Sequence, residues 1–518
     1  MESKPPPTEA VPAVSAAAAM TTGASVARGG IWSAVSEVAP QLFALAISIA
    51  GARFLGPNGL GRQSFIAFVV ASSQNVFAFG LPIALMQLAG ESIGAGRPEE
   101  ARSLVSRAWP LAGLGSVVAF GVLLCVAIAG GEPRIAWVLA AITAGVGVVT
   151  AIPGAILKAL QQWRTLAFVI AIASAASAIT TIGVLALGGG VTGMIAVQLA
   201  VAVAIMVAVA TLARRRLAVI APVVVETGAT KRRMVRLAGA YLAGSLITLI
   251  VFRRSELFFL EHYADDREIA LYSVAFGAVT MLVLVPQALA SVVSPAVATL
   301  FGAREHERIR TGYARALRLL LTAALPITAG AVALGPTTVR LIFGSQFGGT
   351  KVPLLILLVA FPLIPLMNAS YSLILGLGKI RFPLVAGLGS AALNIALDFA
   401  LIPDHGAVGA ALANVSAQGA TALATIVYGN RLVGPIRWEV SRLTRALFSS
   451  VAAGPVAFAV VDLLGGAQGV VTGACAGSAT FVGLGVLLKI ISRADAEWLS
   501  AAFGQPIGRL ARHFAAKA

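Results

Sequence analysis

Long apolar runs separated by short polar connections make up most of the chain. Each run holds about 20 residues, enough for one α-helix to cross a hydrocarbon core of ~30 Å. The pattern therefore predicts an all-α polytopic membrane protein with about 14 transmembrane helices. The predicted spans are residues 31–52, 64–89, 109–129, 135–157, 166–187, 191–212, 238–260, 269–293, 319–339, 353–375, 382–403, 407–428, 447–464 and 470–488.

The composition agrees with membrane insertion. Of 518 residues, 58% are hydrophobic and only 11% are charged, whereas soluble domains carry about 25% charged residues. This balance excludes an ordinary soluble protein and a largely disordered chain. The two cysteines, Cys125 and Cys475, lie inside apolar runs without metal-ligand spacing, so neither a disulfide scaffold nor a metal cluster is expected.

The distribution of charge predicts the orientation. The chain has 38 Lys and Arg residues against 21 Asp and Glu, and most of the basic residues fall in alternate connections. Nucleic-acid binding needs a concentrated basic surface, so no nucleic-acid partner is expected. The positive-inside rule instead places both termini in the cytoplasm, and we expect the bacterial cytoplasmic (inner) membrane.

Two similar halves follow one another along the chain. Pro82 in the second span corresponds to Pro286 in the eighth, and Gly190 corresponds to Gly406. Because each half has six spans, an even number, both begin on the same side of the membrane. The halves are therefore predicted to be parallel repeats that enclose a central cavity and suit alternating access.

The predicted organisation has six parts, including two C-terminal helices outside the repeat. They are a disordered cytoplasmic tail (1–27), an N-lobe with spans one to six (28–216), a cytoplasmic linker (217–236), a C-lobe with spans seven to twelve (237–430), spans thirteen and fourteen (431–490), and a cytoplasmic amphipathic tail (491–518).

Charged residues inside the seventh span are candidate substrate ligands. Each such charge costs about 2.5–3.5 kcal/mol or more at the bilayer centre, so Arg253, Arg254 and Glu256 are expected to face the cavity between the lobes. Arg253 and Glu256 are i,i+3 neighbours that can neutralise each other, which leaves Arg254 for an anionic ligand. Alternatively, the long side chains extend to the nearby interface.

Two further carboxylates lie at membrane depth. Glu37 shares a helix face with Gln41, one turn later, and is predicted to be a proton or cation site, or the partner of an arginine in the facing lobe. Asp398 follows Asn394 by one turn, and both a structural role and ion coupling are open.

Uncharged polar groups complete the candidate site. Gln74, Asn75, Asn368 and Tyr371 fall within spans, where such groups either hold helices together or contact sugar hydroxyls.

No enzyme motif is present. The four histidines, His262, His306, His405 and His513, are scattered. The glycines of 188–193 join two predicted spans, whereas a dinucleotide-binding loop joins a strand to a helix. The segment 376–380 lacks the upstream glycine and the Ser or Thr of a phosphate-binding loop. We predict no catalytic residue, no metal and no cofactor.

Three segments resemble a known superfamily. RFLGPNGLGRQSFIAF (53–68), REIALYSVAFG (267–277) and HGAVGAALANV (405–415) are similar to the multidrug/oligosaccharidyl-lipid/polysaccharide (MOP) exporters. The polysaccharide-transporter branch of Wzx-type flippases also has fourteen spans. The resemblance implies MATE-like architecture, with two parallel six-helix lobes plus two extra C-terminal helices.

The resemblance also implies a function. It suggests a flippase that moves a lipid-linked (polyprenyl-pyrophosphate) oligosaccharide across the membrane for polysaccharide biosynthesis. Its partners would be this substrate, membrane lipids and a glycan polymerase or glycosyltransferases. The alternatives are an ion-coupled MATE-type small-molecule antiporter and a lipid-II flippase. A membrane glycan polymerase is disfavoured because the longest predicted external connection spans only 340–352.

Overall fold

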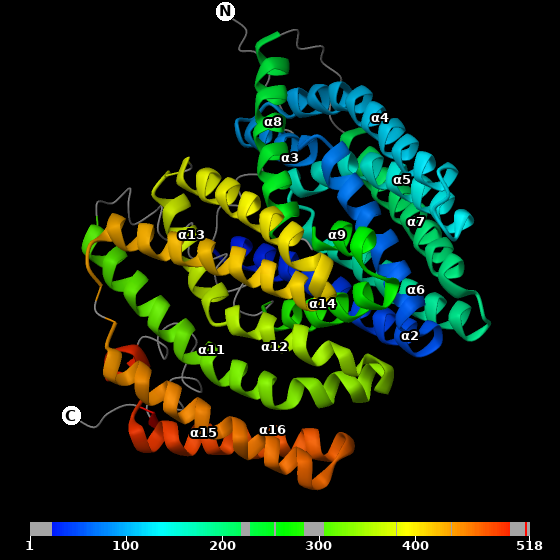
Figure 1. The fold of residues 1–518 in the computed structure, drawn as a ribbon. Helices are drawn as coiled ribbons and strands as arrows, with labels where there is room; N and C mark the ends of the chain where they lie inside the picture. Colours follow the sequence, from blue (N-terminus) through cyan, green and yellow to red (C-terminus); the bar gives the residue numbers. More distant parts are fainter. Residues whose placement is uncertain are drawn as a thin grey trace, which may run out of the picture. The chain divides into compact units, whose positions relative to one another are not determined.

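The computed structural model (Figure 1) describes residues 23–218, 228–252, 255–283, 305–379, 381–436, 438–497 and 513–514. In the first helix it describes side chains from Val38 onward. These residues form helices and no β-strand, as the apolar pattern predicts. The chain divides into two compact units. Unit 1 holds Met1–Phe54 and Ile66–Leu246, and unit 2 holds Leu55–Phe65 and Ile247–Ala518.

Unit 1 is a bundle of long helices. They are α2 (Gly23–Phe77, apart from its Leu55–Phe65 segment), α3 (Leu81–Gly94), α4 (Pro98–Ile128), α5 (Arg134–Ala159), α6 (Trp163–Ala186), α7 (Gly190–Ala218) and α8 (Gly228–Phe252) as far as Leu246. Helix α5 packs against α4 and α7, and alanines such as Ala108, Ala112 and Ala140 are buried there. Small residues let helices approach closely where lipid supplies no hydrophobic driving force.

Unit 2 contains the remaining helices. They are α9 (Glu256–Tyr263), a helix over 266–283, α11 (His306–Phe343), a 3-10 turn η1 (Ser345–Thr350), α12 (Lys351–Ala360), α13 (Leu363–Gly376), α14 (Arg381–Val433), α15 (Val440–Leu464) and α16 (Gly466–Leu488). The C-terminal helices α15 and α16 lie side by side, and α15 also packs on α11.

Two of the longest helices are bent hairpins. Gly56 (φ 69°) interrupts α2 and Gly406 (φ 50°) interrupts α14. This left-handed conformation is readily available to glycine. The two arms of α14 are in contact, because Ser390 Oγ donates to the Ala417 carbonyl at 3.1 Å. The turns fall between the predicted spans one and two and the predicted spans eleven and twelve.

Two spans predicted to be continuous are broken, which corrects the sequence-based boundaries. Between α2 and α3, Gly80 is left-handed, and a Cβ there would lie 2.2 Å from the Ala238 carbonyl of α8. Helices α12 and α13 meet at a bend of 40°. Hydropathy alone does not report these breaks, because the residues around them remain apolar.

The outer surface confirms a multi-pass membrane protein. Large apolar side chains are widely exposed on the described helices, among them Ile179 (72%), Val385 (68%) and Leu487 (73%). A soluble surface rarely displays so much contiguous apolar area. By length and apolarity, nine described helices could cross a membrane, or ten if α12 and α13 form one span. The count of fourteen stays a prediction, as do the bounds of the six predicted parts of the chain.

Several predicted features lie outside the described residues. These are most of the N-terminal tail, much of the linker and of the eighth span, and most of the C-terminal amphipathic tail.

Candidate functional site

A fully buried carboxylate, Glu256 at the start of α9, is the centre of a polar cluster in unit 2. Glu256 Oε1 accepts hydrogen bonds from Asn414 Nδ2 at 2.7 Å and from Asn394 Nδ2 at 3.3 Å. The two asparagines come from opposite arms of α14, so the turn at Gly406 brings both to one carboxylate.

Further polar groups extend this cluster. Ser255 Oγ donates to Asn394 Oδ1 at 3.3 Å, and Gln418 Nε2 donates to Asn414 Oδ1 at 2.6 Å. The Tyr272 hydroxyl also interacts with the Glu256 carboxylate. The amide groups are thus oriented by their own partners and present their N–H groups to Glu256.

A second buried carboxylate adjoins the first. Asp398 follows Asn394 by one helical turn and is fully buried. Neither of its carboxylate oxygens has a hydrogen-bond partner among the described residues, and its charge interacts unfavourably with that of Glu256. We call Glu256 and Asp398 the acidic pair.

The acidic pair requires a compensating positive charge. In the part of the chain that the structure describes, no Lys or Arg is buried. Two adjacent carboxylates in a low dielectric are not both ionised unless a proton or cation accompanies them. Carboxylate oxygens are suitable ligands for a hard cation. The described residues contain no group of three or more His, Cys, Asp or Glu that could hold a metal ion.

The structure brings together only some of the site residues predicted from the sequence. Glu256, Asn394 and Asp398 are brought together in unit 2. Arg253 and Arg254 lie outside the described residues, and so does the side chain of Glu37. The predicted contact of Glu256 with Arg253 is therefore not described, whereas its bonds to the two asparagines are.

The uncharged candidates do not join this cluster. Gln74 Nε2 donates to the Thr143 carbonyl of α5 at 3.1 Å, which joins two helices of unit 1. Asn75 bonds to the Ala71 carbonyl of its own helix. Gln41 and Asn368 are half-buried, and Tyr371 is 43% exposed.

Sequence reasoning missed Asn414 and Ser255 as site residues. The available signal was the pair Asn414 and Gln418, two amides one helical turn apart in an otherwise apolar run. Their role became evident only after the turn at Gly406 aligned both arms of α14 with α9.

An ion-pair cluster lies at one end of unit 2. Arg62 contacts Glu261 at 2.7 Å and Asp266 at 3.2 Å. Burial raises the pKa of both carboxyl groups, and the Arg62 guanidinium opposes that rise. A Cβ at Gly61 would lie 1.6 Å from the Asp266 carbonyl oxygen, so a glycine is needed for this close approach. The cluster holds the α2 turn against α9 and the segment that follows it.

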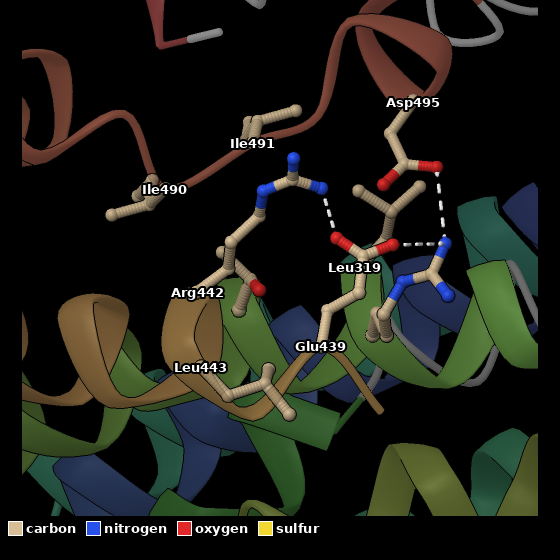
Figure 2. Close-up of a pocket in the computed structure, with 9 residues that line it drawn as sticks. Leu319, Glu439, Arg442, Leu443, Ile490, Ile491 and Asp495 are labelled. Atoms are coloured by element: carbon tan, nitrogen blue, oxygen red, sulfur yellow. Dashed lines mark hydrogen bonds and ion pairs between the residues drawn. The ribbon is translucent and has the colours of Figure 1, made fainter. Parts of the chain in front are cut away.

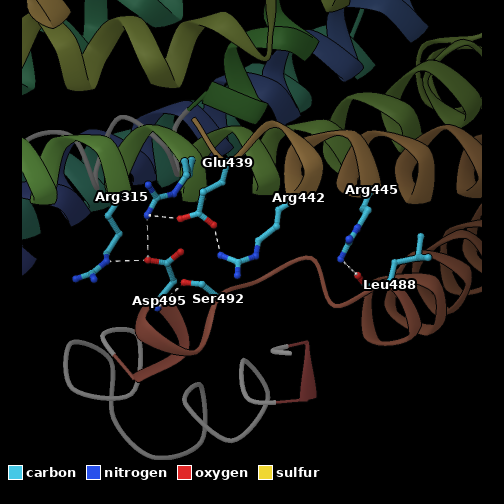
Figure 3. A network of polar contacts seen from close by, with 8 residues as sticks. Arg315, Glu439, Arg442, Arg445, Leu488, Ser492 and Asp495 are labelled. Atoms are coloured by element: carbon cyan, nitrogen blue, oxygen red, sulfur yellow. Dashed lines mark hydrogen bonds and ion pairs between the residues drawn. The ribbon is translucent and has the colours of Figure 1, made fainter. Parts of the chain in front are cut away.

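A second charge network joins the C-terminal helices to α11 (Figures 2 and 3). Arg315 Nε contacts Asp495 at 2.8 Å, and Arg318 bridges Asp495 at 3.5 Å and Glu439 at 3.4 Å. Arg442 pairs with Glu439. The enclosed space is about 10 Å³, the size of one water molecule. This network is therefore a structural connection rather than a ligand site.

Comparison with known proteins identifies the family. The family model described as "Polysaccharide biosynthesis protein" matches residues 51–351, more than half of the chain. No curated protein matches the sequence.

Solved structures share the fold. "Lipid II flippase MurJ, inward closed conformation" has a TM-score of 0.69 at 14% identity, covering 88% of this chain and 98% of that one. An inward-facing multidrug resistance MATE family transporter of the MOP superfamily has a TM-score of 0.65 at 17% identity. The match covers 77% of this chain and 98% of that one. A MOP superfamily transporter from Pyrococcus furiosus has a TM-score of 0.59 at 17% identity. The match covers 79% of this chain and 95% of that one.

The expected superfamily and fold class are thereby confirmed. The family match covers two of the three segments that carry the resemblance, and the neighbours are transporters rather than enzymes. The chain belongs to the polysaccharide biosynthesis protein family and has the fold of the MOP superfamily.

Proposed function

We propose that the protein is a flippase that moves a polyprenyl-pyrophosphate-linked oligosaccharide across the bacterial cytoplasmic membrane by alternating access. The observation that carries this proposal is the polysaccharide biosynthesis family match on a fold shared with a lipid II flippase and with MATE transporters. A glycan polymerase or glycosyltransferase is the corresponding partner. Both termini are assigned to the cytoplasm on the positive-inside rule.

The sequence supplies a host for the pyrophosphate. Arg254, together with Arg253, is assigned to the anionic group, because guanidinium binds phosphate oxygens in bidentate fashion. Glu37 and the uncharged candidates are assigned to the sugar. With an inside-negative potential, outward movement of two negative charges is downhill by roughly 4–5 kcal/mol per 100 mV, so the potential alone can drive export.

The acidic pair supports a second energy source. A cation or proton bound between Glu256 and Asp398 would relieve their repulsion and draw α9 toward both arms of α14. Binding would therefore favour one arrangement of unit 2 over another, which is the requirement for coupling. The same ion-binding carboxylates would serve an ion-coupled antiporter, which is the main alternative function.

Sodium-dependent thermal unfolding tests this coupling site. Replacing choline by sodium is expected to raise the unfolding midpoint of the purified protein, because a ligand that binds only the folded state stabilises it. Asp398→Asn should remove that response. Asp462→Asn is the matched control, since Asp462 is exposed on α15. An equal sodium response in all three proteins excludes a sodium site here, and a midpoint that responds only to pH indicates a proton.

Vesicle transport tests the function itself. Purified protein in vesicles should flip a fluorescent polyprenyl-pyrophosphate oligosaccharide, faster with a potential that favours anion export. Arg254→Gln should slow transport at least tenfold and Arg254→Lys less, because lysine keeps the charge but loses the bidentate geometry. Sodium- or proton-linked efflux of a cationic drug, with no flipping, would contradict the proposal and favour the antiporter.

A further inference from the structure

Unit 2 contains an open cavity of about 370 Å³ at the end that holds the Arg62 ion pairs. It is lined by Leu55, Gly56, Pro57, Asn58, Arg267 and Gln346. These residues come from the α2 turn, the start of the helix over 266–283, and η1. Its volume lies in the lower part of the range of about 300–1,000 Å³ typical of small-molecule sites.

Among the described residues, Arg267 is the one charged residue that lines the cavity, although it sits in an acidic stretch. Each acidic neighbour is already engaged. Asp265 Oδ1 accepts the backbone N–H of Glu268 at 2.9 Å, and Glu268 Oε2 accepts the backbone N–H of Ala407 at 2.8 Å. Asp266 pairs with an arginine of the α2 turn. In the described part of the chain, no hydrogen bond or ion pair therefore joins Arg267 to these three carboxylates, whose bonds go to other groups.

Arg267 itself makes no hydrogen bond or ion pair with any residue that the structure describes. Its exposed side chain lies beside a cavity, so its five N–H donors are available to a ligand. A planar guanidinium matches a carboxylate or phosphate group better than any neutral group. The cavity thus has a recognition element for an anion.

The other polar lining groups are two carboxamides, Asn58 and Gln346. Each side chain offers two hydrogen-bond donors and an acceptor, so it can bind sugar hydroxyls, which both donate and accept. Gly56 faces Gln346, and a Cβ at Gly56 would lie 3.4 Å from Gln346 Oε1. Gly56 and Gln346 are therefore neighbours in one wall of the cavity.

We propose that this cavity is a binding site for an anionic saccharide, in which Arg267 pairs with a carboxylate or phosphate substituent and Asn58 and Gln346 bind hydroxyl groups. The inference rests on the proposed function. The positive-inside distribution assigns all three lining segments to the outer side, so the site would receive the glycan after translocation. A phospholipid headgroup shares the phosphate chemistry but lacks the sugar.

Binding of free sugars to the full-length protein in nanodiscs tests the site. Ligand-observed NMR should detect D-glucuronate more strongly than D-glucose or acetate. Arg267→Gln should weaken glucuronate binding at least tenfold. Asn58→Ala and Gln346→Ala should each weaken it several-fold. The matched control is Arg134→Gln, because Arg134 is also exposed at the predicted outer end of a helix, in unit 1.

Four results would overturn the inference. The first is equal glucuronate binding by wild type and Arg267→Gln. The second is a loss of glucuronate binding in the control Arg134→Gln as large as that in Arg267→Gln. The third is binding of acetate or glucose as tight as that of glucuronate, which indicates an unselective surface. The fourth is complete competition by phosphatidylglycerol nanodiscs, which indicates a lipid site. Since these side chains are exposed, unchanged unfolding midpoints should confirm that the variants fold.

The vesicle assay separates this inference from the proposed function. If wild-type protein binds glucuronate but flips no lipid-linked oligosaccharide, the proposed function fails and the saccharide site stands. If wild-type protein flips the substrate but Arg267→Gln changes neither binding nor transport, the site fails and the function stands.

Discussion

The individual residue that best illustrates the limits of sequence reasoning is Asn414. Its amide donates to the buried Glu256 carboxylate at 2.7 Å, yet it is 158 residues away in the chain. An amide in an apolar run signals only that the side chain needs a partner. Which partner it finds is a property of the fold, and here it is one member of the acidic pair.

Removing that amide should be costly. Asn414→Ala leaves the fully buried Glu256 with one fewer donor, and such a loss costs about 1–3 kcal/mol, more for a charged group. We expect a lower midpoint of thermal unfolding in detergent. Asn75→Ala is the matched control, because Asn75 is exposed and bonds only to its own helix. Equal midpoints for the two variants would contradict the assigned role of Asn414.

At the scale of elements, the contact of α15 with α16 depends on glycines. A Cβ at Gly473 would lie 2.8 Å from the Ala457 carbonyl oxygen, and one at Gly477 would lie 2.9 Å from Ala457 Cβ. The hydropathy pattern predicted both helices. It did not predict which face is shared, because glycines occur on several faces of α16.

A single methyl group should separate these helices. Gly473→Ala forces the backbones apart or strains them, with an expected cost of about 1–3 kcal/mol. Gly483→Ala lies in the same helix where a Cβ meets nothing within 4 Å, and should be neutral or slightly stabilising. Thermal unfolding measures both. A destabilised Gly483→Ala together with a neutral Gly473→Ala would show that the helices pack differently.

At the scale of the whole molecule, the two-unit transporter fold follows from hydropathy, charge asymmetry and the internal repeat. Unit 2 nevertheless includes residues 55–65, which a division at the predicted linker assigns to the N-lobe. The ion pairs of Arg62 with Glu261 and Asp266 explain the difference, since they hold this turn to unit 2. Contacts between distant segments, not chain order, define the unit.

Cysteine labelling tests the predicted orientation of the whole chain. In a variant lacking Cys125 and Cys475, Asn58→Cys should react with a membrane-impermeant maleimide on intact cells. Ser106→Cys should react only after permeabilisation, because it lies on the predicted cytoplasmic side. Both positions are exposed. The reverse pattern would contradict the positive-inside assignment.

The amino-acid sequence alone determined that this is a helical membrane protein of the MOP type. Membrane insertion depends on the length of each apolar run and on the charge of its flanking loops, and both are local properties of the sequence. It also singled out Glu256, Asn394 and Asp398. Only the tertiary structure decided that these three meet, since glycine turns and helix breaks set which faces converge. It likewise decided that Arg267 lies beside a cavity, because the residues that line the cavity come from three segments remote from one another in the chain.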